Sequence, residues 1–144
     1  TADAYKAAPL WAFNQNAGAA TFKKLCAACH QPDEKSERLA PKLEGTGSKG
    51  IDYIIENVID PNAVIGRDFQ ARMVVTDNGQ VYSGLVESEN DSAITLRTAT
   101  SSVTIAKDQI EAMRVSDDSF MPVGLLNSLN ERERIELLKY LMSL

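Results

Sequence analysis

The chain has 144 residues, 44% of them hydrophobic, which suits one globular domain or two very small ones that share a surface. Its formal net charge is −5 at pH 7, so nucleic acid is not an expected partner. No apolar run is long enough to span a bilayer. The chain starts at Thr1 without a methionine or a signal-peptide core, so we expect a processed mature form or a piece of a longer protein.

Residues 1–16 predict an N-terminal arm that contains a proline and three aromatic side chains. The simplest interpretation is that the aromatic side chains pack on the main body, and docking to another domain is the alternative. The three aromatic residues are Tyr5, Trp11 and Phe13.

From Ala17 to about Ala28 apolar residues recur at steps of three and four, which predicts a helix. Gly18 is a poor helix former near the start of this helix. We therefore expect another helix to approach its backbone closely, because glycine lets two helix backbones meet.

The stretch Cys26-Ala27-Ala28-Cys29-His30 holds both cysteines and the only histidine of the chain. C-x-x-C-H is the attachment signature of c-type haem. Two thiols one helical turn apart reach the two vinyl groups along one edge of a porphyrin, and the next imidazole then falls beneath the iron. We therefore predict one covalently attached haem c, with Cys26 and Cys29 as thioether anchors and His30 as the proximal axial ligand.

A thiol–disulfide motif and a zinc site are the alternatives for the two cysteines. A redox C-x-x-C normally begins a helix beside a strand, whereas this one closes a helix. Zinc would need a further ligand from a loop acid such as Asp33 or Glu34.

Residues 31–50 are polar and rich in turn formers, which predicts a loop. A proximal histidine needs an acceptor for its second ring nitrogen, and a backbone carbonyl near Pro41 is our candidate. A short helix is expected from Ile51 to Ile59, where an apolar stripe ends at the stop signal Asp60-Pro61-Asn62.

From Gln70 to Val115 the pattern changes to short runs that favour strands, separated by polar turns. Asp77-Asn78-Gly79 between two such runs predicts a hairpin, and Gly84 within a run suits a bend or bulge. We expect a small, strongly bent antiparallel sheet or barrel of about five strands in meander order. Met73 and Met113 fall in these runs and are expected in the core of the sheet.

A helical pattern returns at the end of the chain, where Asn130 and Glu133 predict a capping box. Before it lies a loop that contains Met121 followed by Pro122. Because no second histidine exists, methionine is the usual sixth ligand, and a thioether must come from irregular chain. We expect Met121 to be that ligand; a hydrophobic plug, another ligand or an open site are the alternatives.

The helical parts of the chain resemble a class I cytochrome c. In that family a glycine and an aromatic precede the first haem cysteine at four-residue steps, as Gly18 and Phe22 precede Cys26. The resemblance implies that Leu137 and Tyr140 of the terminal helix pack across this glycine. It also implies that the Pro41 carbonyl supports the proximal histidine and that Met121 is the distal ligand.

Residues 67–116 depart from an ordinary class I cytochrome c, because a β block stands where a loop or short helices are usual. With Asp60-Pro61-Asn62 before the block and Ser119-Phe120-Met121-Pro122 after it, the chain resembles the haem-binding cytochrome domain common in planctomycetes. That domain often lies at the C-terminal end of large dehydrogenases. The block itself looks Sm-like, but RNA binding is not carried over, because its acidic residues outnumber its basic ones.

The expected fold is a mostly α cytochrome c fold, with three or more helices around the haem and an inserted small antiparallel β-sheet, and is α+β overall. The expected domains are an arm at 1–16, a haem domain at 17–66 and 117–144, and an inserted β domain at 67–116. The two ends of the β block, near Arg67 and Ser116, should lie close together.

The predicted function is outer-sphere electron transfer by a mono-haem c-type cytochrome whose iron is held by a histidine and a methionine. A haem-based sensor of a diatomic gas, with a displaceable Met121, is one alternative; an electron-transfer domain of a larger dehydrogenase is the other. No distal acid–base pair is recognisable, so we do not expect an enzyme. A redox partner protein, such as a dehydrogenase or a terminal oxidase, is implied, and covalent haem attachment implies a periplasmic or otherwise exported location.

Overall fold

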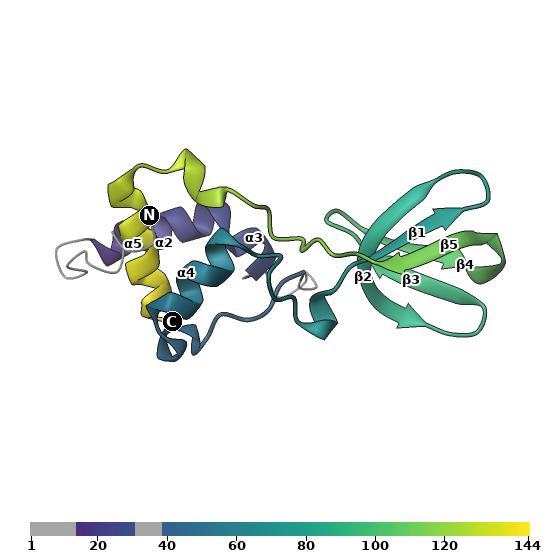
Figure 1. The fold of residues 1–144 in the computed structure, drawn as a ribbon, viewed down its shortest axis with the longest axis horizontal. Helices are drawn as coiled ribbons and strands as arrows, with labels where there is room; N and C mark the ends of the chain where they lie inside the picture. The colour runs from purple at the N-terminus through teal and green to yellow at the C-terminus, as the bar shows by residue number, and fades with distance from the viewer. Residues whose placement is uncertain (1–13, 31–38) are drawn as a thin grey trace. The chain divides into compact units, whose positions relative to one another are not determined.

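The structure is a computed structural model that describes residues 14–30 and 39–144. The aromatic residues of the arm and the loop acids Asp33 and Glu34 lie outside the described residues. The chain divides into two compact units, Thr1–Val64 with Met121–Leu144, and Ile65–Phe120. The first unit is helical and the second is a β-sheet (Figure 1), so the α+β class predicted from the sequence is confirmed.

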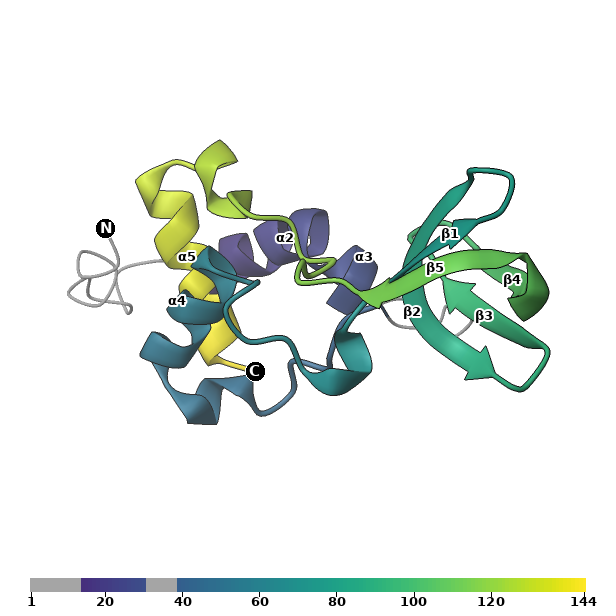
Figure 2. The ribbon, with the colours of Figure 1, turned by 45° about the vertical axis from the view of Figure 1, so that its right-hand side comes forward.

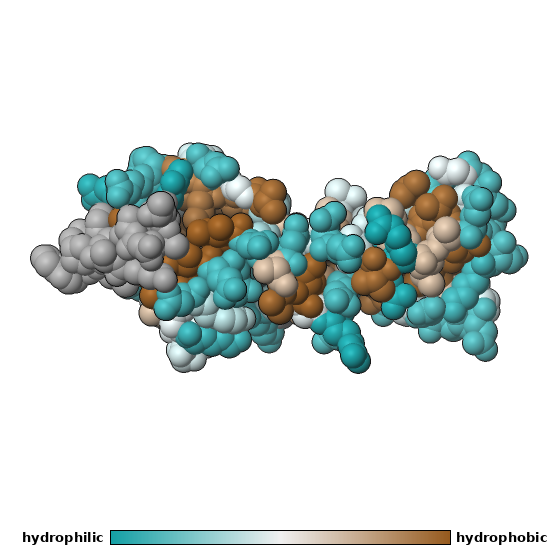
Figure 3. Space-filling view, viewed as in Figure 1, coloured by the Kyte–Doolittle hydropathy of each residue, from teal (hydrophilic) through white to brown (hydrophobic). Residues whose placement is uncertain are grey.

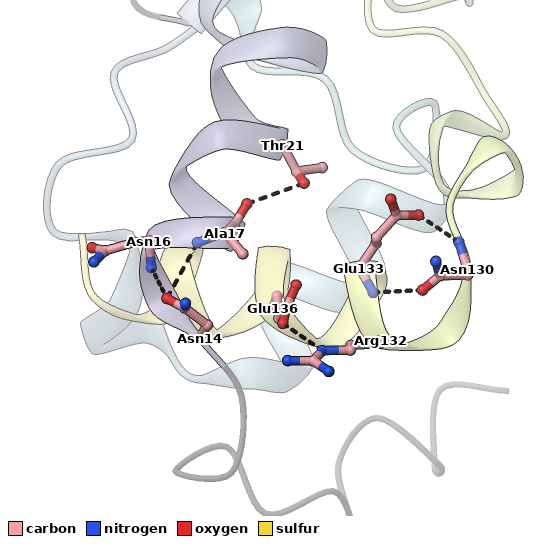
Figure 4. Close-up of polar contacts among 8 residues, drawn as sticks. All are labelled: Asn14, Asn16, Ala17, Thr21, Asn130, Arg132, Glu133 and Glu136. Carbon is pink, nitrogen blue, oxygen red and sulfur yellow. Dashed lines mark hydrogen bonds and ion pairs between the residues drawn. The ribbon is translucent and has the colours of Figure 1, made fainter.

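In the described residues, the first helix of the helical unit is α2 (Gln15–Leu25), which is capped by Asn14. The Asn14 side-chain oxygen accepts from the backbone N–H groups of Asn16 at 2.9 Å and Ala17 at 3.4 Å (Figure 4). The helix is interrupted at Cys26, where φ is −118°, and the chain continues as the short helix α3 (Ala27–His30). The single helix expected as far as Ala28 is therefore two helices that join at the first cysteine.

Two further helices complete the described part of this unit. Helix α4 (Ile51–Ile59) has the bounds predicted from its apolar stripe and follows the 3₁₀ turn η2 (Thr46–Lys49). Helix α5 (Glu131–Met142) follows the 3₁₀ turn η5 (Leu125–Ser128). Its predicted capping box is confirmed, since Glu133 N–H donates to Asn130 Oδ1 at 2.9 Å and Asn130 N–H donates to Glu133 Oε2 at 2.8 Å (Figure 4).

Helices α2 and α5 lie side by side in Figures 1 and 2 and meet at Gly18. A Cβ built on Gly18 would lie 1.9 Å from the carbonyl oxygen of Glu136 and 2.9 Å from Cβ of Tyr140. The rings of Phe22 and Tyr140 are 5.2 Å apart beside this contact. The expected close approach at Gly18 is confirmed. The buried core around it comprises Phe22, Ile54, Ile55, Leu126, Ile135, Leu137, Leu138 and Leu141.

The β unit contains five antiparallel strands in the spatial order β4-β3-β2-β1-β5. Their bounds are β1 (Arg72–Thr76), β2 (Val81–Glu89), β3 (Ala93–Arg97), β4 (Ser102–Ala106) and β5 (Ile110–Val115). The strands lie close to the predicted runs, but the order is not a simple meander. After β4 the 3₁₀ turn η4 (Lys107–Gln109) redirects the chain, and β5 pairs with β1 instead of extending the sheet beyond β4 (Figure 2).

Strand β2 passes close to β3 at Gly84, and its pairing becomes irregular a few residues later. A Cβ at Gly84 would lie 2.7 Å from the carbonyl oxygen of Arg97, and the pairing of β2 with β3 shifts register between Val86 and Ser88. The core cluster of this unit comprises Val74, Ile94, Leu96 and Ile105. Bending lets one face of a small sheet surround these side chains.

A hydrogen bond joins the residues that flank the first and last strands of the sheet. The Ser116 N–H donates to the Ala71 carbonyl at 2.8 Å, and both residues are buried. The chain therefore enters and leaves the sheet at one place, as the sequence led us to expect.

Neither methionine of the β unit is in its core, which corrects the prediction for both. Met113 is 40% exposed because β5 is an edge strand, and Met73 is half-buried with its sulfur 3.5 Å from Nη2 of Arg114. Apolar side chains also reach the surface elsewhere in the chain (Figure 3), including Val64 and Val123 of the helical unit. Within the described ranges, no helix has the length and apolar character needed to cross a membrane.

Replacing Gly18 by alanine tests the contact between α2 and α5, because the contact and helix propensity predict changes of opposite sign in the free energy of unfolding. Helix propensity alone predicts that Gly18→Ala stabilises the protein by about 1 kcal/mol. The contact with the Glu136 carbonyl predicts instead a loss of roughly 1–3 kcal/mol through overpacking. Denaturant unfolding of the variant measures which effect wins.

Ala20→Gly is the matched control for this experiment, because Ala20 lies on an exposed face of the same helix. It should lose about 1 kcal/mol through propensity alone. A Gly18→Ala protein that is more stable than the wild type would show that the two backbones are not in close contact there.

Candidate haem site

The two cysteines lie one helical turn apart at the junction of α2 and α3. Both are half-buried free thiols, and the N–H groups of Cys29 and His30 donate to the Cys26 carbonyl at 3.2 and 3.0 Å. Burial, with a smaller contribution from Cys29, raises the pKa of the Cys26 thiol to about 11. The nucleophilic cysteine of a redox C-x-x-C has a lowered pKa, so this environment does not fit the thiol–disulfide alternative.

The ring of His30 is held by the backbone of the following loop. Its Nδ1 lies 2.8 Å from the carbonyl oxygen of Pro41. A carbonyl oxygen only accepts, so Nδ1 carries the proton of this hydrogen bond and, in the neutral ring, Nε2 keeps a free lone pair. Burial lowers the pKa of His30, and the hydrogen bond to Pro41 opposes that shift. The neutral tautomer that results is the form that ligates a metal.

Met121 is the first residue after the β unit and belongs to the same compact unit as Cys26, Cys29 and His30. It is half-buried and lies in irregular chain before η5. Of the other methionines, Met73 and Met113 belong to strands of the β unit. Met142 packs against the helical core from α5.

Zinc has little support in the described part of the chain. Residues 14–30 and 39–144 contain no group of three or more histidine, cysteine, aspartate or glutamate side chains that could hold a metal ion. The donor set that the structure does present, a pair of thiols followed by an oriented neutral imidazole, fits covalent attachment of haem c.

The sequence did not single out Arg134, although the structure gives it an unusual position. Its Nε donates to the carbonyl oxygens of Leu126 at 2.8 Å and Leu129 at 2.9 Å. An arginine in a polar helical turn predicts only a solvated side chain, so no sequence signal pointed to these contacts.

The cytochrome c family model matches residues 15–144. The chain belongs to the cytochrome c family. Haem c is therefore its covalently attached cofactor. The matched region includes the C-x-x-C-H stretch at residues 26–30. A search of the curated proteins found none that matches this cytochrome c.

Among solved structures, this cytochrome c is similar to the 1.55 Å crystal structure of the pleiotropic translational regulator Hfq. The match has 20% sequence identity and a TM-score of 0.32, and covers 45% of this chain and 88% of the Hfq chain.

Removing both thiols tests the attachment of haem. In the double variant Cys26→Ser, Cys29→Ser we expect haem to be lost on denaturation, because no thioether bond can form. The wild-type polypeptide should keep one haem under the same conditions, as measured by intact mass and by haem staining of a denaturing gel. A double variant that still carries haem after denaturation would show that attachment occurs elsewhere in the chain.

Proposed function

We propose that this cytochrome c is a mono-haem electron carrier whose iron is held by His30 on the proximal side and by Met121 on the distal side. The observation that carries the proposal is the 2.8 Å contact between His30 Nδ1 and the Pro41 carbonyl. It fixes the tautomer and the orientation of the only histidine in the chain, which is what a permanent axial ligand needs.

Haem c supplies a one-electron couple between ferrous and ferric iron. The protein chain anchors the haem and tunes the reduction potential of the iron. Cys26 and Cys29 hold the cofactor covalently, and the Pro41 carbonyl makes the His30 imidazole a better donor. The thioether of Met121, a soft ligand, favours the ferrous form and raises the reduction potential.

The protein meets its redox partners outside the cytoplasm under this proposal. Covalent haem attachment is a feature of exported proteins, and we place this one in the periplasm. The resemblance to the planctomycete-type haem-binding domain supports a dehydrogenase or a terminal oxidase as the electron donor or acceptor. The same resemblance allows this cytochrome c to serve as the electron-transfer domain of a longer dehydrogenase. No catalytic role is proposed for its own residues.

A diatomic gas sensor is the second candidate, and one observation favours it. The β unit ends at Phe120 and the proposed ligand is the next residue, Met121. The last strand, β5, ends at Val115, so a change in the sheet would reach the ligand through the short segment 116–120. In a sensor Met121 would leave the iron readily, whereas in a carrier it would stay bound.

Replacing Met121 by alanine separates the carrier from the sensor. Optical spectra of both oxidation states should change in Met121→Ala, and the ferrous variant should bind carbon monoxide readily. If Met121 is off the iron for about 1% of the time, the wild type should bind carbon monoxide about a hundredfold more weakly than the variant. Titration of the ferrous proteins measures this ratio.

Met113→Ala is the matched control, because Met113 is an exposed methionine of the β unit, and it should behave as the wild type does. An unchanged spectrum in Met121→Ala would show that another residue is the sixth ligand. Carbon monoxide binding by the wild type as tight as that of Met121→Ala would replace the carrier with the sensor.

A further inference from the structure

Arg134 links helix α5 to the 3₁₀ turn η5, which precedes this helix in the sequence. It lies in the first turn of α5, and its Nε donates to the carbonyl of Leu126 at 2.8 Å and to that of Leu129 at 2.9 Å. Both hydrogen bonds are partly buried. Hydrogen bonds from a charged donor are stronger than neutral ones, and partial burial increases this difference.

One acceptor, Leu126, lies within the 3₁₀ turn η5, and the other, Leu129, is the residue that caps its C-terminal end. The Leu126 carbonyl also accepts the N–H of Leu129 at 3.1 Å, and the Leu126 side chain is buried in the helical core. The Leu129 side chain packs against the same core. Arg134 therefore fixes η5 to α5 at the backbone, in addition to the apolar packing of its side chains.

The chain between Met121 and η5 is short, and Pro122 restricts the conformation at its start. Only Pro122, Val123 and Gly124 separate Met121 from Leu125, and proline allows a single range of φ. Gly124 has a φ of +75°, and its carbonyl accepts the N–H of Asn127 at 2.9 Å. A segment this short transmits the position of η5 directly to Met121.

We propose that Arg134 is the positioning residue for the distal ligand: by holding η5 on α5, it keeps Met121 on the iron. This inference rests on the proposed function, in which Met121 is the sixth ligand. Loss of the two hydrogen bonds frees η5 to move relative to α5, and the thioether then dissociates more often. The chemical identity of the ligand does not change, but the fraction of time for which it is bound does.

Arg132 offers an internal comparison in the same turn of α5. Its side chain is 71% exposed, and its Nε bonds to Oε1 of the buried Glu136 at 2.9 Å, within the helix (Figure 4). Removal of Arg132 deprives a buried carboxylate of this partner and should lower stability. It leaves the contacts of Arg134 with η5 untouched, so it controls for a general loss of stability.

The experiment compares Arg134→Leu, Arg134→Lys and Arg132→Leu with the wild type and with Met121→Ala, all as haem-loaded proteins. The readout is the rate at which the ferrous protein binds carbon monoxide, with thermal unfolding measured in parallel. We expect Arg134→Leu to bind carbon monoxide about tenfold faster than the wild type, because the charge-assisted hydrogen bond that Nε–H shares between the two carbonyls is lost. Arg134→Lys, which keeps the charge without the Nε donor, should lie between the two. Arg132→Leu should keep the wild-type rate.

Equal rates for Arg134→Leu and the wild type, or equal increases in Arg134→Leu and Arg132→Leu, would overturn the role of Arg134. If Arg134→Leu does not fold, the comparison of Arg134→Lys with Arg132→Leu decides in the same way. A Met121→Ala protein with the wild-type spectrum would overturn the proposed function and this inference together. A changed Met121→Ala spectrum with an unchanged Arg134→Leu rate would overturn this inference alone.

Discussion

The contact of two helix backbones at Gly18 is the constraint on which the helical unit depends. Helix α2 leads directly to the haem-attachment motif, whereas α5 lies beyond the β unit in sequence. A side chain at Gly18 would collide with the Glu136 carbonyl, so glycine is what allows these distant segments to share one core. The same core buries Leu126 of η5, and Arg134 then fixes the backbone of η5 to α5. His30 and Met121, the proposed axial ligands, therefore both lie in segments that are attached to the pair of helices α2 and α5.

Features that depend on local chemistry were predictable from the sequence. The capping box of Asn130 and Glu133, the bounds of α4 and the hairpin at Asn78-Gly79 each need only a few neighbouring residues. The attachment motif is local too, because its chemistry requires two thiols and an imidazole on a single turn. The acceptor for His30 was predictable as a type of group, since metal-bound histidines need one.

Features that depend on distant pairing were not predictable in the same way. The sequence predicted the strands themselves, but not that β5 returns to β1, because each short run pairs equally well with several partners. The exposure of Met113 follows from that pairing, since an apolar residue on an edge strand has no neighbour on one side. Arg134 was missed because its acceptors are backbone carbonyls, which leave no mark in the residue pattern.

The hydrogen bond between Ser116 and Ala71 has a consequence for how such a chain can arise and change. The first and last strands of the sheet are held together at one point. The entropic cost of closing the inserted segment as a loop of the helical unit therefore depends only weakly on the length of that segment. Doubling the inserted segment would cost only about 0.6 kcal/mol more in loop closure. The site between α4 and Met121 is therefore a position at which evolution, or a protein engineer, can exchange one self-closing module for another without redesigning the haem-binding scaffold.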